Sequence, residues 1–235
     1  MNQTGFSPFS REHLLALAVI ALAGGAIVAV CRRAAPRCVR RLGRALGVVL
    51  IGYVVTAYGQ KAAAGELSWE YSLPLELCHG VLAACALSLF RPTQLASEIA
   101  YYWGLAGALQ ATLTPEIGQG FPSWEFILFF WGHGAILLAI VFLIASRGLQ
   151  PRRGSVLRMV AAVNLYALVI GGIDWLAGWN YGYLCHKPVK PSLMDYLGPW
   201  PWYIASLELI ALASFAILDL PWLWLRRSTK RAAAR

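Results

Sequence analysis

Three ionisable side chains lie within four residues at the start of a long apolar run: Glu76, Cys78 and His79. An ionisable group inside a bilayer costs at least ~2.5 to 3.5 kcal/mol on insertion scales, so such groups indicate a functional site. A thiol could act as a nucleophile, an imidazole as its base and a carboxylate as the group that orients the base. The structural alternative is that Glu76 and His79 pair one turn apart while Cys78 packs as a small apolar side chain.

Further polar side chains recur at a similar depth in the other apolar segments. With a rise of ~1.5 Å per residue along each helix, they fall near one level of the membrane. Convergence of this kind predicts a polar cavity in one half of the bilayer. The full set comprises Glu76, Cys78, His79, Gln110, His133, Asp174 and Glu208.

Neighbouring residues on one helix point ~100° apart, so Cys78 and His79 cannot easily bond each other. We therefore expect His133, from another helix, to act as the base for Cys78, with Glu208 or Glu76 orienting the ring. The candidate catalytic residues are Cys78, His133 and Glu208. The other candidates would contact the substrate, and they are Glu76, His79, Gln110 and Asp174. Because apolar burial opposes a thiolate, the site must be partly wet.

The elements that position these groups are transmembrane helices. Hydrophobic residues make up 59% of the 235 and charged residues 13%, which excludes a soluble domain. Apolar stretches long enough to cross ~30 Å of hydrocarbon predict an all-α, polytopic membrane protein, with residues 1–235 forming one integral membrane domain. The seven predicted spans are 13–32, 42–61, 72–90, 95–114, 124–146, 156–178 and 201–225.

The basic residues predict the orientation of these helices. Sixteen of the 20 Lys and Arg lie on one side, in segments 32–44, 91, 147–158 and 226–235. Cytoplasmic loops retain Lys and Arg, so the N-terminus should face out and the C-terminus in, in a multi-pass protein of the plasma membrane. The opposite side keeps only Arg11, Lys61, Lys187 and Lys190. The net charge of +9 therefore reports topology, and no segment resembles a nucleic-acid-binding module.

The loop between the last two predicted helices is rich in aromatic residues and proline, which is typical of a rigid segment at the level of the lipid headgroups. We expect it to contact substrate. Its candidate residues are Asn180, Tyr181, Lys187, Trp200, Trp202 and Tyr203. The structural alternative is an interfacial lid without chemistry.

Four motifs together resemble the YwaF-type integral membrane protein family over about residues 70 to 222. They are the runs 73–78 (LPLELC), 132–134 (GHG), 180–188 (NYGYLCHKP) and 197–203 (LGPWPWY). The animal relatives of that family are cysteine-dependent acyltransferases that move a fatty acyl chain from a phospholipid to a lysophospholipid. The resemblance implies the same fold, Cys78 as the acyl-accepting nucleophile, and phospholipids or lysophospholipids as partners.

A different class remains open, namely a non-enzymatic carrier in which Glu76, His79, His133 and Glu208 bind protons or a lipid headgroup. No inverted repeat is visible to support a transporter. A metal or haem site built from His79, His133, Cys185 and His186 is disfavoured, because adjacent Cys and His residues are poorly spaced for chelation. A retinal pump is excluded, since the last predicted helix contains no lysine. We expect no metal and no cofactor.

Overall fold

The computed structural model describes residues 5–146, 149–189 and 193–233. Three basic residues that were counted for the topology, Arg147, Lys190 and Arg235, lie outside these ranges. Within them every named element is helical, as the composition predicts. The elements are α1 (Arg11–Arg33), α2 (Pro36–Ala63), α3 (Trp69–Ser72), α4 (Leu77–Phe90), α5 (Gln94–Trp103), η1 (Gly104–Ala108), α6 (Leu109–Leu113), α7 (Trp124–Ala145), α8 (Ser155–Ala177), η2 (Tyr181–Tyr183), η3 (Leu193–Leu197) and α9 (Trp202–Ala233).

In the described residues, five helices are long and apolar enough to cross a membrane: α1, α2, α7, α8 and the first 25 residues of α9. The third and fourth predicted spans differ from these five. Helix α4 has 14 residues, about 21 Å of rise, and begins at Leu77 rather than at residue 72. The fourth predicted span is α5, the π-helical turn η1 and α6 in succession. Seven spans therefore stay a prediction.

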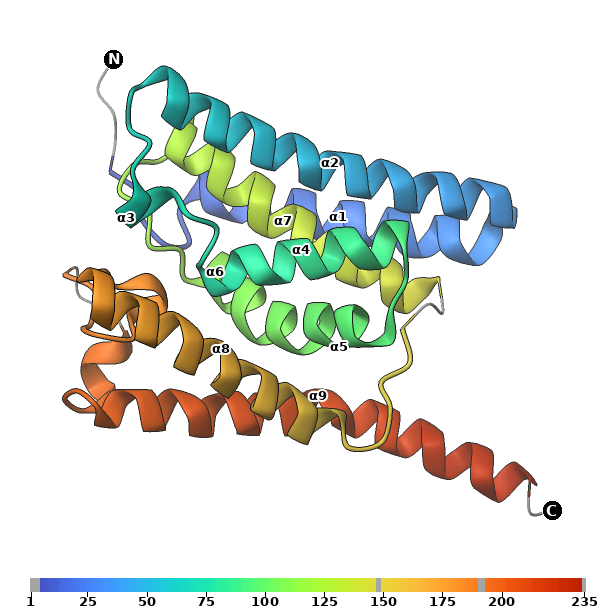
Figure 1. Ribbon diagram of the computed structural model, residues 1–235. Helices are drawn as coiled ribbons and strands as arrows, with labels where there is room; N and C mark the ends of the chain where they lie inside the picture. Colours follow the sequence, from blue (N-terminus) through green and yellow to red (C-terminus); the bar gives the residue numbers. More distant parts are fainter. Residues whose placement is uncertain (1–4, 147–148, 190–192, 234–235) are drawn as a thin grey trace. The chain divides into compact units, whose positions relative to one another are not determined.

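The chain forms two compact units, and the first comprises Met1–Ser72 and Cys78–Gln150. Its core helix is α7, against which α1, α2 and the η1 turn pack (Figure 1). In an apolar stretch of 18 residues, 56% of the residues of α7 are buried, compared with 11% in α1 and 17% in α2. A helix that is apolar on all sides is suited to such a central place.

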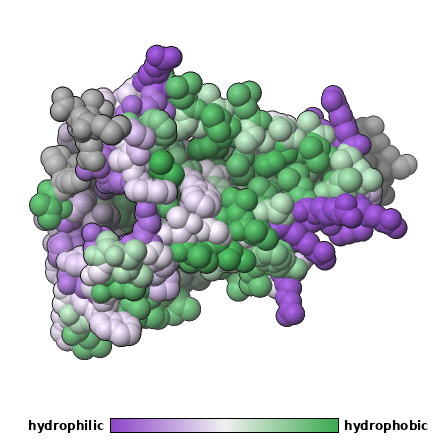
Figure 2. Space-filling view, turned by 90° about the horizontal axis from the view of Figure 1, so that it is seen from above, coloured by the Kyte–Doolittle hydropathy of each residue, from purple (hydrophilic) through white to green (hydrophobic). Residues whose placement is uncertain are grey.

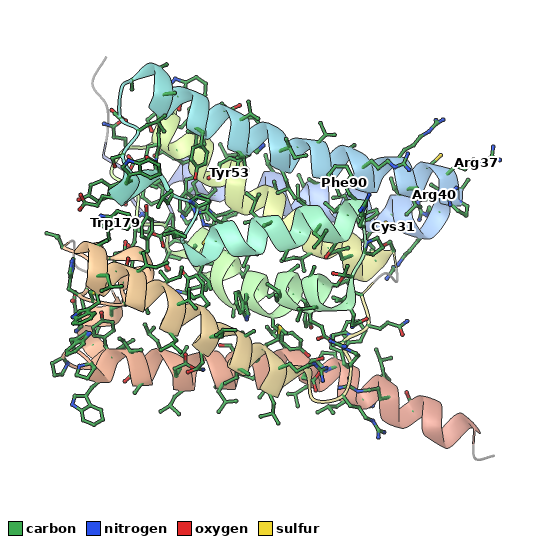
Figure 3. All side chains as sticks on the ribbon, viewed as in Figure 1. Cys31, Arg37, Arg40, Tyr53, Phe90 and Trp179 are labelled. Carbon is green, nitrogen blue, oxygen red and sulfur yellow. The ribbon has the colours of Figure 1, made fainter. Side chains whose placement is uncertain are left out.

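Glycines of α2 bring its backbone close to its neighbours. A Cβ added at Gly47 would lie 2.6 Å from ring carbons of Phe90 on α4, and one added at Gly43 would lie 2.8 Å from Cζ of Phe142 on α7. Phe90 is labelled in Figure 3. Small residues permit this approach in a membrane, where helix association depends on close packing. Gly43 and Gly47 thus serve helix packing.

A buried histidine fixes the start of α1. The side chain of His13 has no exposed surface. Its Nε2 lies 2.9 Å from the carbonyl oxygen of Thr112, at the end of α6, and its Nδ1 accepts from the backbone N–H of Phe9 at 2.9 Å. Both ring nitrogens are therefore used, with the hydrogen on Nε2. His13 is a structural residue.

The second unit comprises Leu73–Leu77 and Pro151–Arg235, and α8 and α9 pack against each other within it. Two tyrosines hold its short first segment. The hydroxyl of Tyr166 donates to the carbonyl of Leu75 at 2.7 Å, and the hydroxyl of Tyr181 accepts from the N–H of Leu73 at 3.1 Å. Helix α8 ends at Gly178, whose φ of 75° is the left-handed conformation typical of a helix C-terminus.

Large apolar side chains are exposed on both units, and apolar residues cover much of the surface seen in Figure 2. Leu22 of α1 is 75% exposed and Trp175 of α8 is 80% exposed. Soluble proteins rarely expose extended apolar surface, whereas a bilayer covers it. The surface agrees with the composition in indicating a membrane protein.

Candidate functional site

Cys78 of α4 and His133 of α7 meet in the first unit. Their Sγ and Nε2 atoms lie 3.6 Å apart. The Nδ1 of His133 lies 3.0 Å from the carbonyl oxygen of Phe129, one turn earlier on α7. A carbonyl oxygen can only accept, so Nδ1 carries the hydrogen and the neutral ring presents the lone pair of Nε2 to the thiol. The pair can thus transfer a proton from sulfur to nitrogen.

The start of α4 contributes to this arrangement. Because the helix begins at Leu77, Cys78 stands in its first turn, where the backbone N–H groups have no partner within the helix. The positive end of the helix dipole stabilises an anion there. A thiolate at Cys78 would gain from both the helix terminus and a protonated His133.

The two glycines around His133 let side chains of the neighbouring helices come close to α7. A Cβ added at Gly132 would lie 2.6 Å from Cζ of Tyr53 on α2, and one added at Gly134 would lie 3.1 Å from Cδ1 of Ile20 on α1. The His133 ring also stacks on Phe129, with centroids 4.3 Å apart. The absence of side chains at these two positions thus allows α1 and α2 to pack closely against α7.

A cavity of about 830 Å³ opens beside the pair, between the C-terminal half of α2 and the N-terminal half of α7. His133 is part of its wall. The other lining residues are Tyr53, Ala57, Gln60, Lys61, Ala63, Ala64, Glu66, Ile117, Trp124, Glu125, Leu128 and Phe129. The wall is mainly apolar with a few polar groups, which is typical of a small-molecule or lipid site.

Two charged residues of this wall have defined hydrogen bonds. The ammonium of Lys61 donates to the carbonyl of Tyr71 at 2.9 Å. The carboxylate of Glu125 accepts from the N–H groups of Gly118 and Gln119 at 3.0 and 2.9 Å. An ammonium has three N–H donors, so Lys61 keeps donors for a ligand after bonding Tyr71.

His79 belongs to the same cluster. Its ring interacts electrostatically with Lys61 and with His133. Its Nδ1 is buried, and among the described residues it has no hydrogen-bond partner. A buried ring nitrogen of this kind is rare in a folded protein and is compatible with a functional role. The first unit thus brings together Cys78, His79 and His133 of the predicted site.

A family comparison covers all of these residues. The model of the TMEM164 family matches residues 8–219. The chain belongs to the TMEM164 family. No curated protein and no solved structure matches it. Membership places Cys78, His133 and Glu208 within the part of the chain that this membrane protein family shares.

Three of the remaining predicted residues, Glu208, Glu76 and Gln110, have other partners. Glu208 on α9 accepts from Nδ2 of Asn164 on α8 at 2.9 Å, and Glu76, just before α4, accepts from the N–H of Gly182 at 3.1 Å. Gln110 is exposed and donates to Thr114 Oγ1 at 2.9 Å. The Nδ1–H of His133 is taken by a backbone carbonyl, and an orienting role for Glu208 or Glu76 stays a prediction. Asp174 is fully buried on α8.

Polar side chains in the loop after α8 and at the start of α9 form hydrogen bonds with backbone groups of that loop. Oδ1 of Asn180 accepts from the N–H groups of Cys185 and His186, each at 3.0 Å. Nε1 of Trp200 donates to the carbonyl of Leu184 at 3.1 Å, and the hydroxyl of Tyr203 donates to the carbonyl of Tyr183. The ammonium of Lys187 lies 5.6 Å from the centre of the Tyr203 ring. Trp202 is 69% exposed. Substrate contacts by these residues stay a prediction.

Sequence reasoning missed the wall that α2 contributes to the cavity. A signal exists in the sequence, because Tyr53, Ala57, Gln60, Lys61 and Ala64 recur at the spacing of one helical face. That face carries an aromatic residue, two small residues and two polar residues. Spacing alone does not show which helix such a face meets.

Proposed function

We propose that the protein is a membrane-embedded acyltransferase that moves a fatty acyl chain from a phospholipid to a lysophospholipid-like acceptor through a thioester at Cys78. The observation that carries the proposal is the Cys78–His133 contact of 3.6 Å, with the hydrogen of His133 directed to Phe129 and the ring in the wall of a cavity. The resemblance of the motifs to YwaF-type proteins and their animal acyltransferase relatives supports the same chemistry.

The reaction has two halves. In the first, Nε2 of His133 takes the thiol proton, sulfur attacks the acyl carbonyl, and the ester C–O bond breaks as His133 returns the proton to the departing lysophospholipid oxygen. In the second, an acceptor hydroxyl gives its proton to His133 and attacks the thioester. The C–S bond breaks, and Cys78 regains its proton. No water is consumed, which favours a site within the membrane.

We also propose seven spans with the N-terminus out, in the plasma membrane, and a polar cavity that opens in the outer half of the bilayer. The distribution of Lys and Arg supports this orientation. Arg37 and Arg40 lie at the start of α2 (Figure 3), whereas Lys61 of the cavity lies near its end. Labelling of Cys185 by an impermeant maleimide on intact cells tests the orientation, and labelling only after permeabilisation would overturn it.

The chemical test uses purified protein in nanodiscs with a phospholipid that carries a labelled acyl chain. Transfer to an added lysophospholipid is expected, together with a hydroxylamine-sensitive acyl group on Cys78. Cys78→Ser should abolish both, because a hydroxyl is far harder to ionise than a thiol with a free pKa of ~8.5. Cys85→Ser, a change of a buried thiol seven residues further along α4, is the matched control and should leave transfer intact.

The same variants separate this proposal from a proton or headgroup carrier. A carrier would tolerate Cys78→Ser, since a serine can still line a polar site. It would fail on Glu76→Gln or Glu208→Gln, each of which removes a titrating group. Full transfer by the serine variant would end the acyltransferase proposal.

A further inference from the structure

Thioester formation places negative charge on the acyl carbonyl oxygen. Enzymes of this kind stabilise that charge with fixed hydrogen-bond donors. His133 cannot supply one while it acts as base, because its Nδ1–H is directed to Phe129 and its Nε2 receives the thiol proton. A side-chain donor near His133 could add to the backbone N–H groups of the first turn of α4.

Tyr53 of α2 offers a phenol O–H beside Gly132, the residue before His133. Its hydroxyl would lie 3.0 Å from a Cβ added at Gly132, next to His133, so the phenol end of the ring rests on the α7 backbone. The ring of Trp131, which also lies on α7, packs edge-on against the Tyr53 ring, and the two ring centroids are 6.2 Å apart. Figure 3 shows Tyr53 on α2.

A further observation links this hydroxyl to the reacting atoms. Tyr53 shares the cavity wall with His133, whose Nε2 lies 3.6 Å from Sγ of Cys78. A substrate acyl group that enters the cavity to reach Cys78 would therefore pass a phenol O–H that is held on the same wall as the base.

Resting on the proposed function, we propose that the Tyr53 hydroxyl donates a hydrogen bond to the acyl carbonyl oxygen during attack by Cys78. As the S–C bond forms, the π electron pair of the carbonyl moves to oxygen, and the phenol stabilises it without giving up its proton. The C–O bond then breaks, the pair returns, and the leaving oxygen takes its proton from His133. Tyr53 serves the second half-reaction in the same way.

The test separates this role from packing. Tyr53→Phe keeps the ring against Gly132 and Trp131 and removes only the hydroxyl. Acylation of Cys78 by a p-nitrophenyl fatty acyl ester, followed as the burst of p-nitrophenolate, should slow by about 100- to 1,000-fold. Alkylation of Cys78 by iodoacetamide forms no oxyanion, so its rate should stay within about twofold of the unsubstituted protein.

The control is Tyr71→Phe, which removes the hydroxyl of an exposed tyrosine in the same unit and should change neither rate. Unchanged acylation in Tyr53→Phe would overturn the inference while leaving the proposed function in place. Equal losses of acylation and alkylation would overturn it too, because Tyr53 would then act on the thiol rather than on the acyl oxygen. If the unsubstituted protein gave no acyl group on Cys78, both the inference and the proposed function would fail.

Discussion

The two units of the chain use their polar side chains in different ways. In the first, His133 and Lys61 line a cavity, Cys78 contacts His133, and Nδ1 of His79 has no hydrogen-bond partner among the described residues. In the second, Asn180, Trp200 and Tyr203 direct their polar atoms to carbonyl and amide groups of their own loop. Both units are rich in aromatic and polar residues, so composition does not distinguish them.

The difference lies in which polar contacts could change during a reaction. A hydrogen bond within a loop stabilises the fold, and its polar atoms have little capacity left for a ligand. A thiol and an imidazole at 3.6 Å, with the far ring nitrogen already fixed by a carbonyl, form a contact that can change during a reaction. The proposed chemistry uses residues of the first unit, so we expect variants of the two units to affect different measurements.

The largest effect is expected from His133→Gln. Without the imidazole no base receives the thiol proton, so acylation of Cys78 should fall by roughly 100- to 10,000-fold. Alkylation by iodoacetamide near neutral pH should slow as well, because the thiolate loses its cationic partner. His79→Gln is the matched control on the neighbouring imidazole, and its alkylation rate should change by no more than a few-fold. A greater loss in His79→Gln than in His133→Gln would make His79 the base.

The next effect is steric and comes from Gly132→Ala. The added Cβ would lie 2.6 Å from Cζ of Tyr53, so the Tyr53 ring, or a helix that carries one of the two residues, must shift. Overpacking of this kind costs about 1 to 3 kcal/mol of stability, and acylation should fall with it. Gly25→Ala on α1 has no neighbouring atom within 4 Å and should be tolerated or slightly stabilising. Equal melting temperatures for the two variants would show that Tyr53 is not held against α7.

The sequence predicts the helices better than it predicts their ends. Apolar runs of about 20 residues account for α1, α2, α7, α8 and α9, because the length of such a run is a local property. The start of α4 at Leu77 depends on bonds from Tyr166 and Tyr181, about a hundred residues away, which hold residues 73–75 outside the helix. No local pattern reports these bonds.

In the candidate site, too, local features can be predicted from the sequence, whereas contacts between helices cannot. The angle between neighbours on a helix predicts that Cys78 needs a histidine from elsewhere, and the structure places His133 at 3.6 Å from it. The carbonyl of Phe129 as the partner of Nδ1 depends on a side-chain rotamer, and Tyr53 depends on which face of α2 meets α7. Neither can be read from spacing, and the catalytic roles of these residues stay predictions.

A smaller effect is expected in the second unit from Asn180→Ala. The change removes the acceptor for the N–H groups of Cys185 and His186 and should lower the free energy of unfolding by about 1 to 3 kcal/mol. Acylation of Cys78 by the p-nitrophenyl ester should stay unchanged in protein that remains folded. Thermal unfolding in nanodiscs measures the stability, and the rate of the p-nitrophenolate burst measures the acylation of Cys78. A loss of acylation without a change in stability would place this loop in the substrate site, as the sequence suggests.

The smallest effect concerns Cys185, a thiol of the second unit in the loop after α8. Burial, and then the negative charge of Asp174, raise the pKa of Cys185 above its ordinary value. At any pH below that pKa a smaller fraction is thiolate, so the pH midpoint of its alkylation should lie above that of N-acetylcysteine. Peptide mass spectrometry after timed exposure to iodoacetamide at a series of pH values measures this midpoint. Asp174→Asn should lower the midpoint only in part, because burial is the larger cause. A midpoint at or below that of N-acetylcysteine would mean that this thiol, like Cys78, has a partner that stabilises its anion, and the contrast between the two units would fail.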